Sequence, residues 1–128
     1  MRILVVDDSE DALDLTEGTL LSAGYKDVIT ASSATDALGI LDVGRPTDED
    51  SAFDLVLLDI AMPVMDGIEA CARIRNDPRY VDLPIIMVTA RDDTDSLANA
   101  FVAGATDYVT KPVDAQILLE RIRHYLAG

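Results

Sequence analysis

Two apolar stretches without alternation, Leu55–Leu58 and Ile85–Val88, constrain the fold more than any other feature of this sequence. A strand that is a continuous apolar run is typically buried on both faces, as in a parallel sheet between two layers of helices. Parallel strands need long crossover connections, and stretches with helical periodicity separate the apolar runs. The sequence therefore predicts an α/β domain with a doubly wound parallel sheet.

Five strands and five helices are expected to alternate along the chain. The predicted strands are Ile3–Asp7, Val28–Ala31, Leu55–Asp59, Ile85–Thr89 and Asp107–Thr110. The predicted helices cover about Glu10–Ala23, Ser33–Val43, Gly67–Asn76, Asp95–Ala103 and Asp114–Leu126. The second and fifth strands are the more polar ones, which is typical of the edges of a sheet. Residues 1–128 are expected to form a single domain, with the polar stretch Gly44–Ser51 as a loop that protrudes away from the site.

Composition argues against several classes of function. The chain has 24 acidic and 10 basic residues and a net charge of −14, which disfavours direct binding of nucleic acid or of anionic membranes. No apolar run reaches the roughly 18 residues of a transmembrane helix. The single cysteine, Cys71, fits a reducing cytoplasm, and we expect it to pack on a helix face. Adaptation to high salt and a bias of the genome would both explain the excess of Asp over Glu, and both interpretations stay open.

Side chains that can carry chemistry follow four of the five predicted strands. Asp7 and Asp8 end the first strand, Asp59 ends the third, Thr89 ends the fourth, and Lys111 follows the fifth. In open parallel sheets, sites form at the carboxyl ends of the strands. Three carboxylates at one edge repel each other, so either a cation lies among them or some are protonated. Oxygen ligands of this kind suit Mg²⁺.

These groups suit phosphoryl transfer, which depends mostly on positioning and on charge stabilisation. An aspartate carboxylate such as Asp59 can act as the nucleophile and form an acyl phosphate. Lys111 would add positive charge, and the Thr89 hydroxyl could donate a hydrogen bond to a phosphate oxygen. A zinc site is not expected, because His124 is the only histidine and falls in the last predicted helix.

Four motifs resemble those of the receiver domains of two-component response regulators, and the resemblance covers residues 2–126. The motifs are Ile3–Asp8, Leu57–Gly67, Val88–Ala90, and Gly104–Ala105 followed by Tyr108–Pro112. The resemblance implies a flavodoxin-like sheet with strand order 2-1-3-4-5, as in chemotaxis regulators. It also implies a cis bond between Lys111 and Pro112. In the family, the two positions that hold Ala61 and Arg91 in this chain control how easily water reaches the phosphoryl group. The rate of dephosphorylation therefore stays open.

The resemblance assigns a role to each site residue. The matched residues are the phosphoacceptor Asp59, the metal ligands Asp7, Asp8, Asp59 and Ala61 (through its backbone carbonyl), the phosphate-binding Lys111, the switch hydroxyl Thr89 and the switch aromatic Tyr108. The implied cofactor is Mg²⁺. Phosphorylation would change the face formed by the fourth helix, the fifth strand and the fifth helix.

Partners and location are also implied by the resemblance. A histidine kinase or a phosphotransfer protein would supply the phosphoryl group in the cytoplasm. An output domain, a partner protein or a second phosphorylated copy, as a homodimer, would receive the signal. The chain would be a phosphoacceptor switch rather than an enzyme, and would assist only its own phosphorylation and dephosphorylation.

Three alternatives fit the residues less well. An aspartyl-phosphate hydrolase of the haloacid-dehalogenase type would carry a second Asp two residues after the nucleophile, where this chain has Ala61. A flavin-binding module would need a Ser-, Thr- and Gly-rich phosphate loop after the first strand, and the acidic Asp7–Glu10 segment would repel a phosphate. A pseudo-receiver that only docks partners would not require the acidic set together with Thr89 and Lys111.

Overall fold

The computed structural model describes residues 1–43, 53–90 and 92–126. The elements in chain order are β1 (Arg2–Val6), α1 (Glu10–Ser22), β2 (Asp27–Ala31), α2 (Ala34–Leu41), β3 (Leu55–Asp59), α3 (Gly67–Arg75), the 3-10 helix η2 (Pro78–Tyr80), β4 (Ile85–Ala90), α4 (Thr94–Ala103), β5 (Asp107–Lys111) and α5 (Ala115–Leu126). None of the described helices has the length and apolar character needed to cross a bilayer. The predicted loop Gly44–Ser51 and the position of Arg91 lie outside the described residues.

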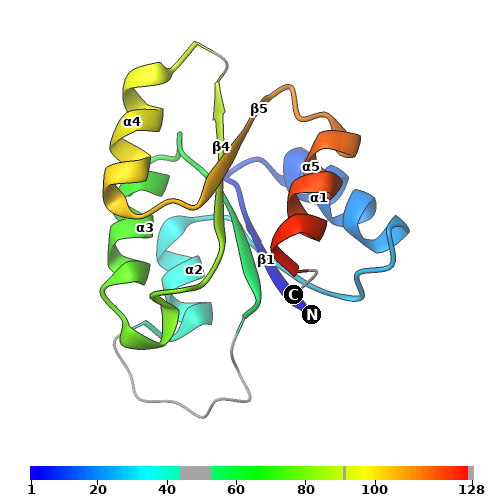
Figure 1. The fold of residues 1–128 in the computed structure, drawn as a ribbon, viewed down its shortest axis with the longest axis horizontal. Coiled ribbons are helices and arrows are strands. Elements are labelled where there is room, and N and C mark those ends of the chain that lie inside the picture. The colour runs from blue at the N-terminus through cyan, green and yellow to red at the C-terminus, as the bar shows by residue number, and fades with distance from the viewer. Residues whose placement is uncertain (44–52, 91, 127–128) are drawn as a thin grey trace.

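All five strands pair in parallel in one sheet, in the order β2-β1-β3-β4-β5. Both the doubly wound fold and the strand order are therefore confirmed, as is the expectation that β2 and β5 form the edges. Figure 1 shows α2, α3 and α4 on one face of the sheet and α1 and α5 on the other. The carboxyl ends of the strands share one edge, at the top of that view.

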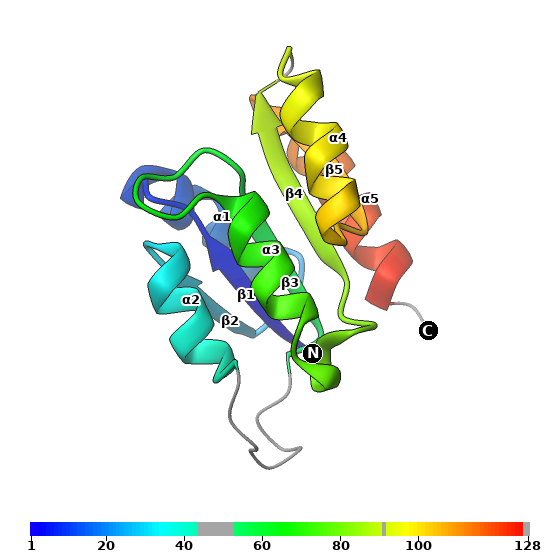
Figure 2. The ribbon, with the colours of Figure 1, turned by 90° about the vertical axis from the view of Figure 1, so that its left-hand side faces the viewer.

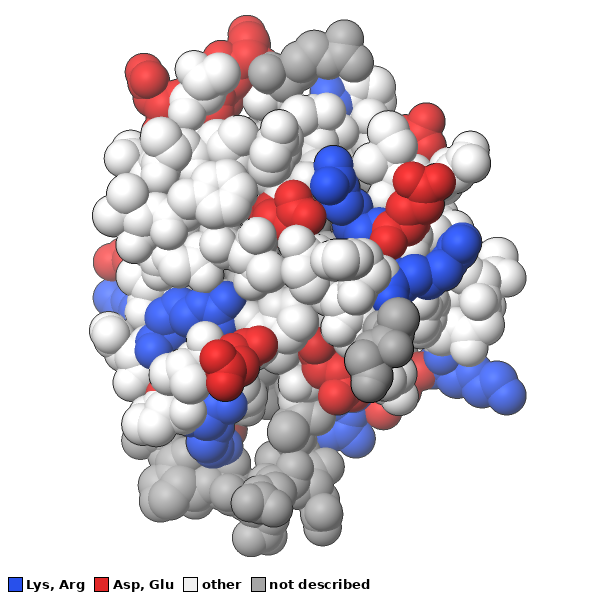
Figure 3. Space-filling view, in the orientation of Figure 1, with Lys and Arg blue, Asp and Glu red and all other residues white. Residues whose placement is uncertain are grey.

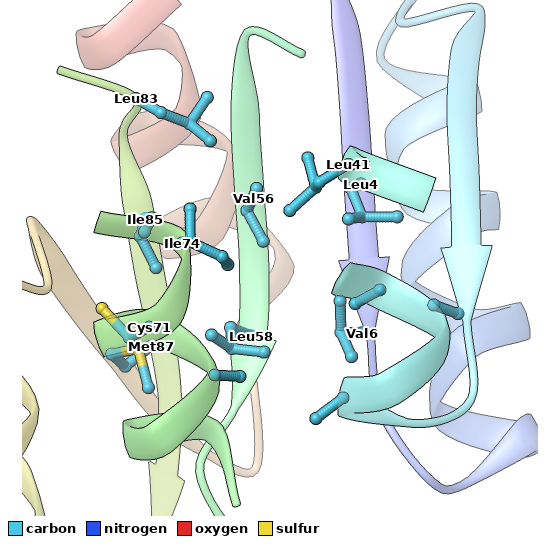
Figure 4. Close-up of a cluster of buried hydrophobic side chains, with 14 of the residues drawn as sticks. Leu4, Val6, Leu41, Val56, Leu58, Cys71, Ile74, Leu83, Ile85 and Met87 are labelled. Atoms are coloured by element: carbon cyan, nitrogen blue, oxygen red, sulfur yellow. The ribbon is translucent and has the colours of Figure 1, made fainter. Parts of the chain in front are cut away.

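Two apolar clusters fill the two faces of the sheet. Every residue of β3 is buried, because its side chains alternate between the two clusters, as its unbroken apolar sequence predicted. In Figure 4, Cys71 and Ile74 extend from α3 toward the strands, near Ile85 and Met87 of β4. Cys71 is fully buried, so its predicted packing role agrees with its position.

Capping residues explain why helix ends differ from the predicted ones by one or two residues. The predicted helices include Ser33 and Asp114 and begin two residues after Asp93. In the structure, Ser33 and Asp93 are N-caps whose side chains accept amide hydrogen bonds. Asp114 does the same for the amides of Gln116 and Ile117. At the other end of α2, Asp42 adopts a left-handed conformation with φ of 56°, which ends the helix before the predicted Val43.

No pattern in the sequence predicted the 3-10 helix η2. Asp77 caps it by accepting a hydrogen bond from the Arg79 amide at 3.0 Å. Tyr80 is buried, and its hydroxyl donates to the Leu41 carbonyl at the end of α2 over 2.7 Å. A three-residue helix has no periodicity to detect, and its partner lies far away in the sequence.

Candidate functional site

Three carboxylates meet at the carboxyl edge of the sheet. Asp7 and Asp8 directly follow β1, and Asp59 is the last residue of the neighbouring strand β3. One carboxylate oxygen from each of the three lies within 4.8 Å of the others. Oxygen ligands at this spacing can surround one divalent cation, and hard cations such as Mg²⁺ prefer them.

Asp59 is the buried member of this cluster. Only 1% of its surface is exposed, and its carboxylate lies against the ammonium of Lys111. Burial raises the pKa of the Asp59 carboxyl, the nearby charge of Asp7 acts in the same direction, and the ammonium of Lys111 opposes both. A buried carboxylate beside two other acids is costly for folding even with one lysine next to it, so its presence at this position points to a ligand or a reaction.

Lys111 supplies the positive charge. It is the last residue of β5, and its Nζ lies 3.0 Å from Oδ1 of Asp59. The peptide bond between Lys111 and Pro112 is cis, as expected. Because the Lys111 side chain is 42% exposed, it can follow a charge that arrives from solvent. The site thus combines a buried carboxylate with a partly exposed ammonium on a flexible stem beside it.

The segment between β3 and α3 packs tightly against Asp59. The Gly67 amide donates to the Ile60 carbonyl over 2.8 Å, and a Cβ at position 67 would collide with the backbone of Asp59, so only glycine fits there. Within this segment, the Met65 amide donates to the Pro63 carbonyl. Val64, which lies between these two residues, has a φ of 71°. This is a γ-turn that a β-branched residue rarely adopts. No feature of the sequence indicated it.

A cavity of about 440 Å³ gives access to the cluster. Five predicted site residues line it: Asp7, Asp8, Asp59, Ala61 and Lys111. The remaining wall is mostly apolar and comes from the strands β1, β3 and β4, from α1 and α5, and from the residues that follow β5. The cavity is much larger than one cation needs, so a phosphoryl group can also enter.

Thr89 and Tyr108 do not line this cavity. Thr89 is 2% exposed, and its hydroxyl makes only a long hydrogen bond of 3.4 Å to the adjacent Ala90 carbonyl. Tyr108 pairs with Met87 in the sheet, and its half-buried ring packs edge-to-face on Phe101 of α4 with centroids 6.2 Å apart. Neither residue is therefore part of the cavity wall, and Tyr108 connects β5 to α4 through Phe101.

Charge elsewhere is mixed. On the face shown in Figure 3, basic and acidic side chains of the described residues are interspersed, and no continuous basic field forms. With the net charge of −14, this face is poorly suited to a nucleic acid. His124 lies exposed in the last turn of α5, stacked edge-to-face on Tyr125 and away from the acidic cluster.

Comparison with known proteins identifies relatives over nearly the whole chain. A family model described as response regulator receiver domain matches residues 3–123. Transcriptional regulatory protein YvrH of Bacillus subtilis (strain 168) is 36% identical over 124 residues, which is 97% of this chain and 48% of that protein. Chemotaxis protein CheY1 of Helicobacter pylori is 33% identical over 122 residues, which is 95% of this chain and 94% of that protein.

Solved structures agree. The structure of the chemotaxis response regulator CheY4 of Vibrio cholerae superposes with a TM-score of 0.84 at 31% identity, and the match covers 98% of each chain. The present chain spans about half the length of YvrH but nearly all of CheY1.

Proposed function

This chain belongs to the response regulator receiver domain family of two-component signalling, and we propose that phosphorylation of Asp59 is the event by which it signals. The observation that carries the proposal is the state of the Asp59 carboxylate, which is buried, pairs with the Lys111 ammonium at 3.0 Å and lies beside two other acids. A solvated strand-end aspartate would show none of these features.

The donor set fits Mg²⁺ as the cofactor. Asp7, Asp8 and Asp59 supply carboxylate oxygens within 4.8 Å of one another, and the backbone carbonyl of Ala61, at the cavity wall, would complete the protein ligands. When bound, Mg²⁺ would neutralise charge on the oxygens of the incoming phosphoryl group. The burial of Asp59 next to two further carboxylates supports this assignment, because a cation would offset the negative charge that Lys111 alone leaves.

The residues of the chain divide the reaction between them. An oxygen of Asp59 attacks phosphorus, and the bond from phosphorus to the donor nitrogen or oxygen breaks as the new acyl phosphate bond forms. Lys111 follows the phosphoryl group and pairs with one of its oxygens, since the ammonium already reaches Asp59. A histidine kinase or a phosphotransfer protein is the proposed donor in the cytoplasm, and the chain acts as a switch rather than as an enzyme on other substrates.

The switch runs from the site through Thr89 to Tyr108. The weakly bonded Thr89 hydroxyl turns toward a phosphoryl oxygen, and Tyr108 rotates into the space that Thr89 leaves. This changes the face of α4, β5 and α5, which then contacts an output domain, a partner protein or a second copy of the chain.

Mass spectrometry of the intact protein tests the proposal. After incubation with acetyl phosphate and Mg²⁺, the chain should gain the mass of one phosphoryl group in an acid-labile adduct. Asp59→Asn should abolish this gain. Asp54→Asn is the matched control, because Asp54 is exposed near the opposite end of the same strand. If Asp59→Asn still gains the adduct, the acceptor lies elsewhere and the proposal is wrong.

A further inference from the structure

Arg75, the last residue of α3, binds three acceptors in two other segments with one guanidinium group. Its Nε donates to the Gly104 carbonyl at 2.9 Å, Nη1 to the Tyr80 carbonyl at 2.6 Å, and Nη2 to the Thr106 hydroxyl at 3.1 Å. Two of these acceptors lie at the junction between α4 and β5. Hydrogen bonds from a charged donor are the stronger kind, and the planar fork of Arg fixes their directions.

The junction that Arg75 binds is itself tightly built. Gly104 caps α4 with a φ of 113°, and a Cβ there would lie 2.7 Å from Cγ of Arg75, so glycine lets the arginine stem approach. The Thr106 hydroxyl also accepts from the Ile85 amide at 3.0 Å, which ties the junction to β4. One turn earlier on α3, the Cys71 thiol contacts the Ala103 carbonyl over 3.8 Å. Figure 2 shows α3 and α4 side by side, as these contacts require.

The opposite half of α4 is held far less. Exposure does not separate the two halves, because residues 94–99 and 101–103 are all exposed or half-exposed and Ala100 is the one fully buried residue of this helix, but the hydrogen bonds do. Among the described residues, side chains of other elements make no hydrogen bond to residues 94–99. The cap of this end is local, because the Ser96 amide donates to the carboxylate of Asp93. Few buried contacts and a local cap are what lower the cost of local opening.

We propose that Arg75 is a positioning residue of the switch, which holds the end of α4 at residues 103–106 as a fixed pivot so that only the first half of the helix rearranges. This inference rests on the proposed function, since it concerns how the response to Asp59 spreads. A hinge absorbs motion at a few residues while the anchored side keeps its contacts. Phe101, which packs on Tyr108, lies on the anchored half, so the rotation of Tyr108 acts against a fixed surface.

Amide hydrogen exchange on the full chain, read residue by residue by NMR, tests the pivot. In the resting protein, Arg75→Met should speed exchange of the protected amides at 100–106 by at least about tenfold relative to those in β1 and β3, because charge-assisted bonds are lost while the stem is kept. Arg73→Met is the matched control, since Arg73 is exposed on the same helix and pairs only with Glu69 over 3.3 Å. Arg75→Lys, with one charge but no fork, should restore only part of the protection.

The second part of the experiment repeats the exchange measurement with beryllium fluoride, a mimic of the phosphoryl group, and Mg²⁺. Binding of beryllium fluoride at Asp59 is monitored by ¹⁹F NMR. In the wild-type chain, exchange should change at 94–99 and stay constant at 100–106, whereas in Arg75→Met it should change across both halves. Equal protection of 100–106 in Arg75→Met and Arg73→Met, or equal response of both halves in the wild type, would overturn the pivot.

The proposed function is judged separately. If beryllium fluoride fails to bind in the wild type, Asp59 is not the acceptor, and the switch and its pivot are both wrong. The resting-state arm would then still report whether Arg75 anchors α4.

Discussion

Lys111 and Asp59 form an ion pair with Nζ and Oδ1 3.0 Å apart. The contact is a charge interaction between a half-exposed ammonium and a fully buried carboxylate. It offsets only part of the cost of burial, because the pKa of Asp59 remains raised. The resting site thus favours binding of a cation or a phosphoryl group at some expense in stability.

Replacing Asp59 with Asn should stabilise the metal-free protein. We expect a gain of about 1–3 kcal/mol in the free energy of unfolding at pH 7 in EDTA, since a buried charge beside two other acids is removed. Because the pKa of Asp59 is raised in the folded state, the wild-type protein gains stability as pH falls through that pKa, and the advantage of Asp59→Asn should shrink there. Urea denaturation between pH 4 and about pH 8 measures this. An advantage that grows as pH falls would contradict the assignment.

Asp8→Asn should weaken Mg²⁺ binding by at least about tenfold, measured by NMR titration. Asp7→Asn should weaken it less, because Asp7 Oδ1 already accepts a hydrogen bond from the Ser9 amide at 2.9 Å and contributes mainly through water. Glu17→Gln removes the same charge from α1 outside the cluster. Equal losses in Asp8→Asn and Glu17→Gln would indicate a general effect of net charge.

Lys111→Ala should impair phosphoryl uptake more than folding. In EDTA, we expect a loss on the order of 1 kcal/mol in the free energy of unfolding, because the Asp59 charge loses its partner while the exposed ammonium is already screened by water. In saturating Mg²⁺ the loss should disappear. Lys26→Ala, which replaces the only other lysine, is the control. A large loss of stability that persists in Mg²⁺ would show that Lys111 is structural.

Tyr125→Phe should destabilise the protein by about 1 kcal/mol, because the Tyr125 hydroxyl donates to Asp107 Oδ2 over 2.8 Å. Burial, together with this hydrogen bond, raises the pKa of Tyr125, so the bond stabilises the folded state below about pH 10 and its contribution is lost as pH rises through the raised pKa. Melting temperatures from pH 8 to about pH 11 should fall more steeply for the wild type than for Tyr125→Phe. Tyr25→Phe should behave like the wild type.

Thr89→Ala should uncouple the site from the α4, β5 and α5 face. With beryllium fluoride and Mg²⁺, chemical shifts in the wild type should change around Thr89, at 94–99 and at 107–111, because a hydrogen bond to a charged acceptor is enough to change a ratio of two states about tenfold or more. In Thr89→Ala, only the residues that line the cavity should respond. Distant shifts that survive in Thr89→Ala would rule out the coupled movement of Thr89 and Tyr108.

Local sequence signals predicted the elements well and their ends less well. Unbroken apolar runs such as Leu55–Leu58 identify strands because burial on both faces leaves no polar position. The ends of helices depend on caps, and Ser33 or Asp93 can stand either inside a helix or just before it. Such a residue is a cap when its side chain accepts a hydrogen bond from the backbone amide two or three residues later. Hydrophobic periodicity carries no information about that bond.

By itself, the sequence determined the five strands, their polar edges, and the acidic and basic groups at the strand ends, because those properties depend on residues adjacent in the chain. Only the tertiary structure decided that Asp59 is buried beside Lys111, that Thr89 and Tyr108 lie outside the cavity, and that Arg75 joins α3 to η2 and to the junction between α4 and β5. Each of these is a contact between residues far apart in the chain. Such contacts are settled by how helices and strands pack around one another, and no local pattern encodes them.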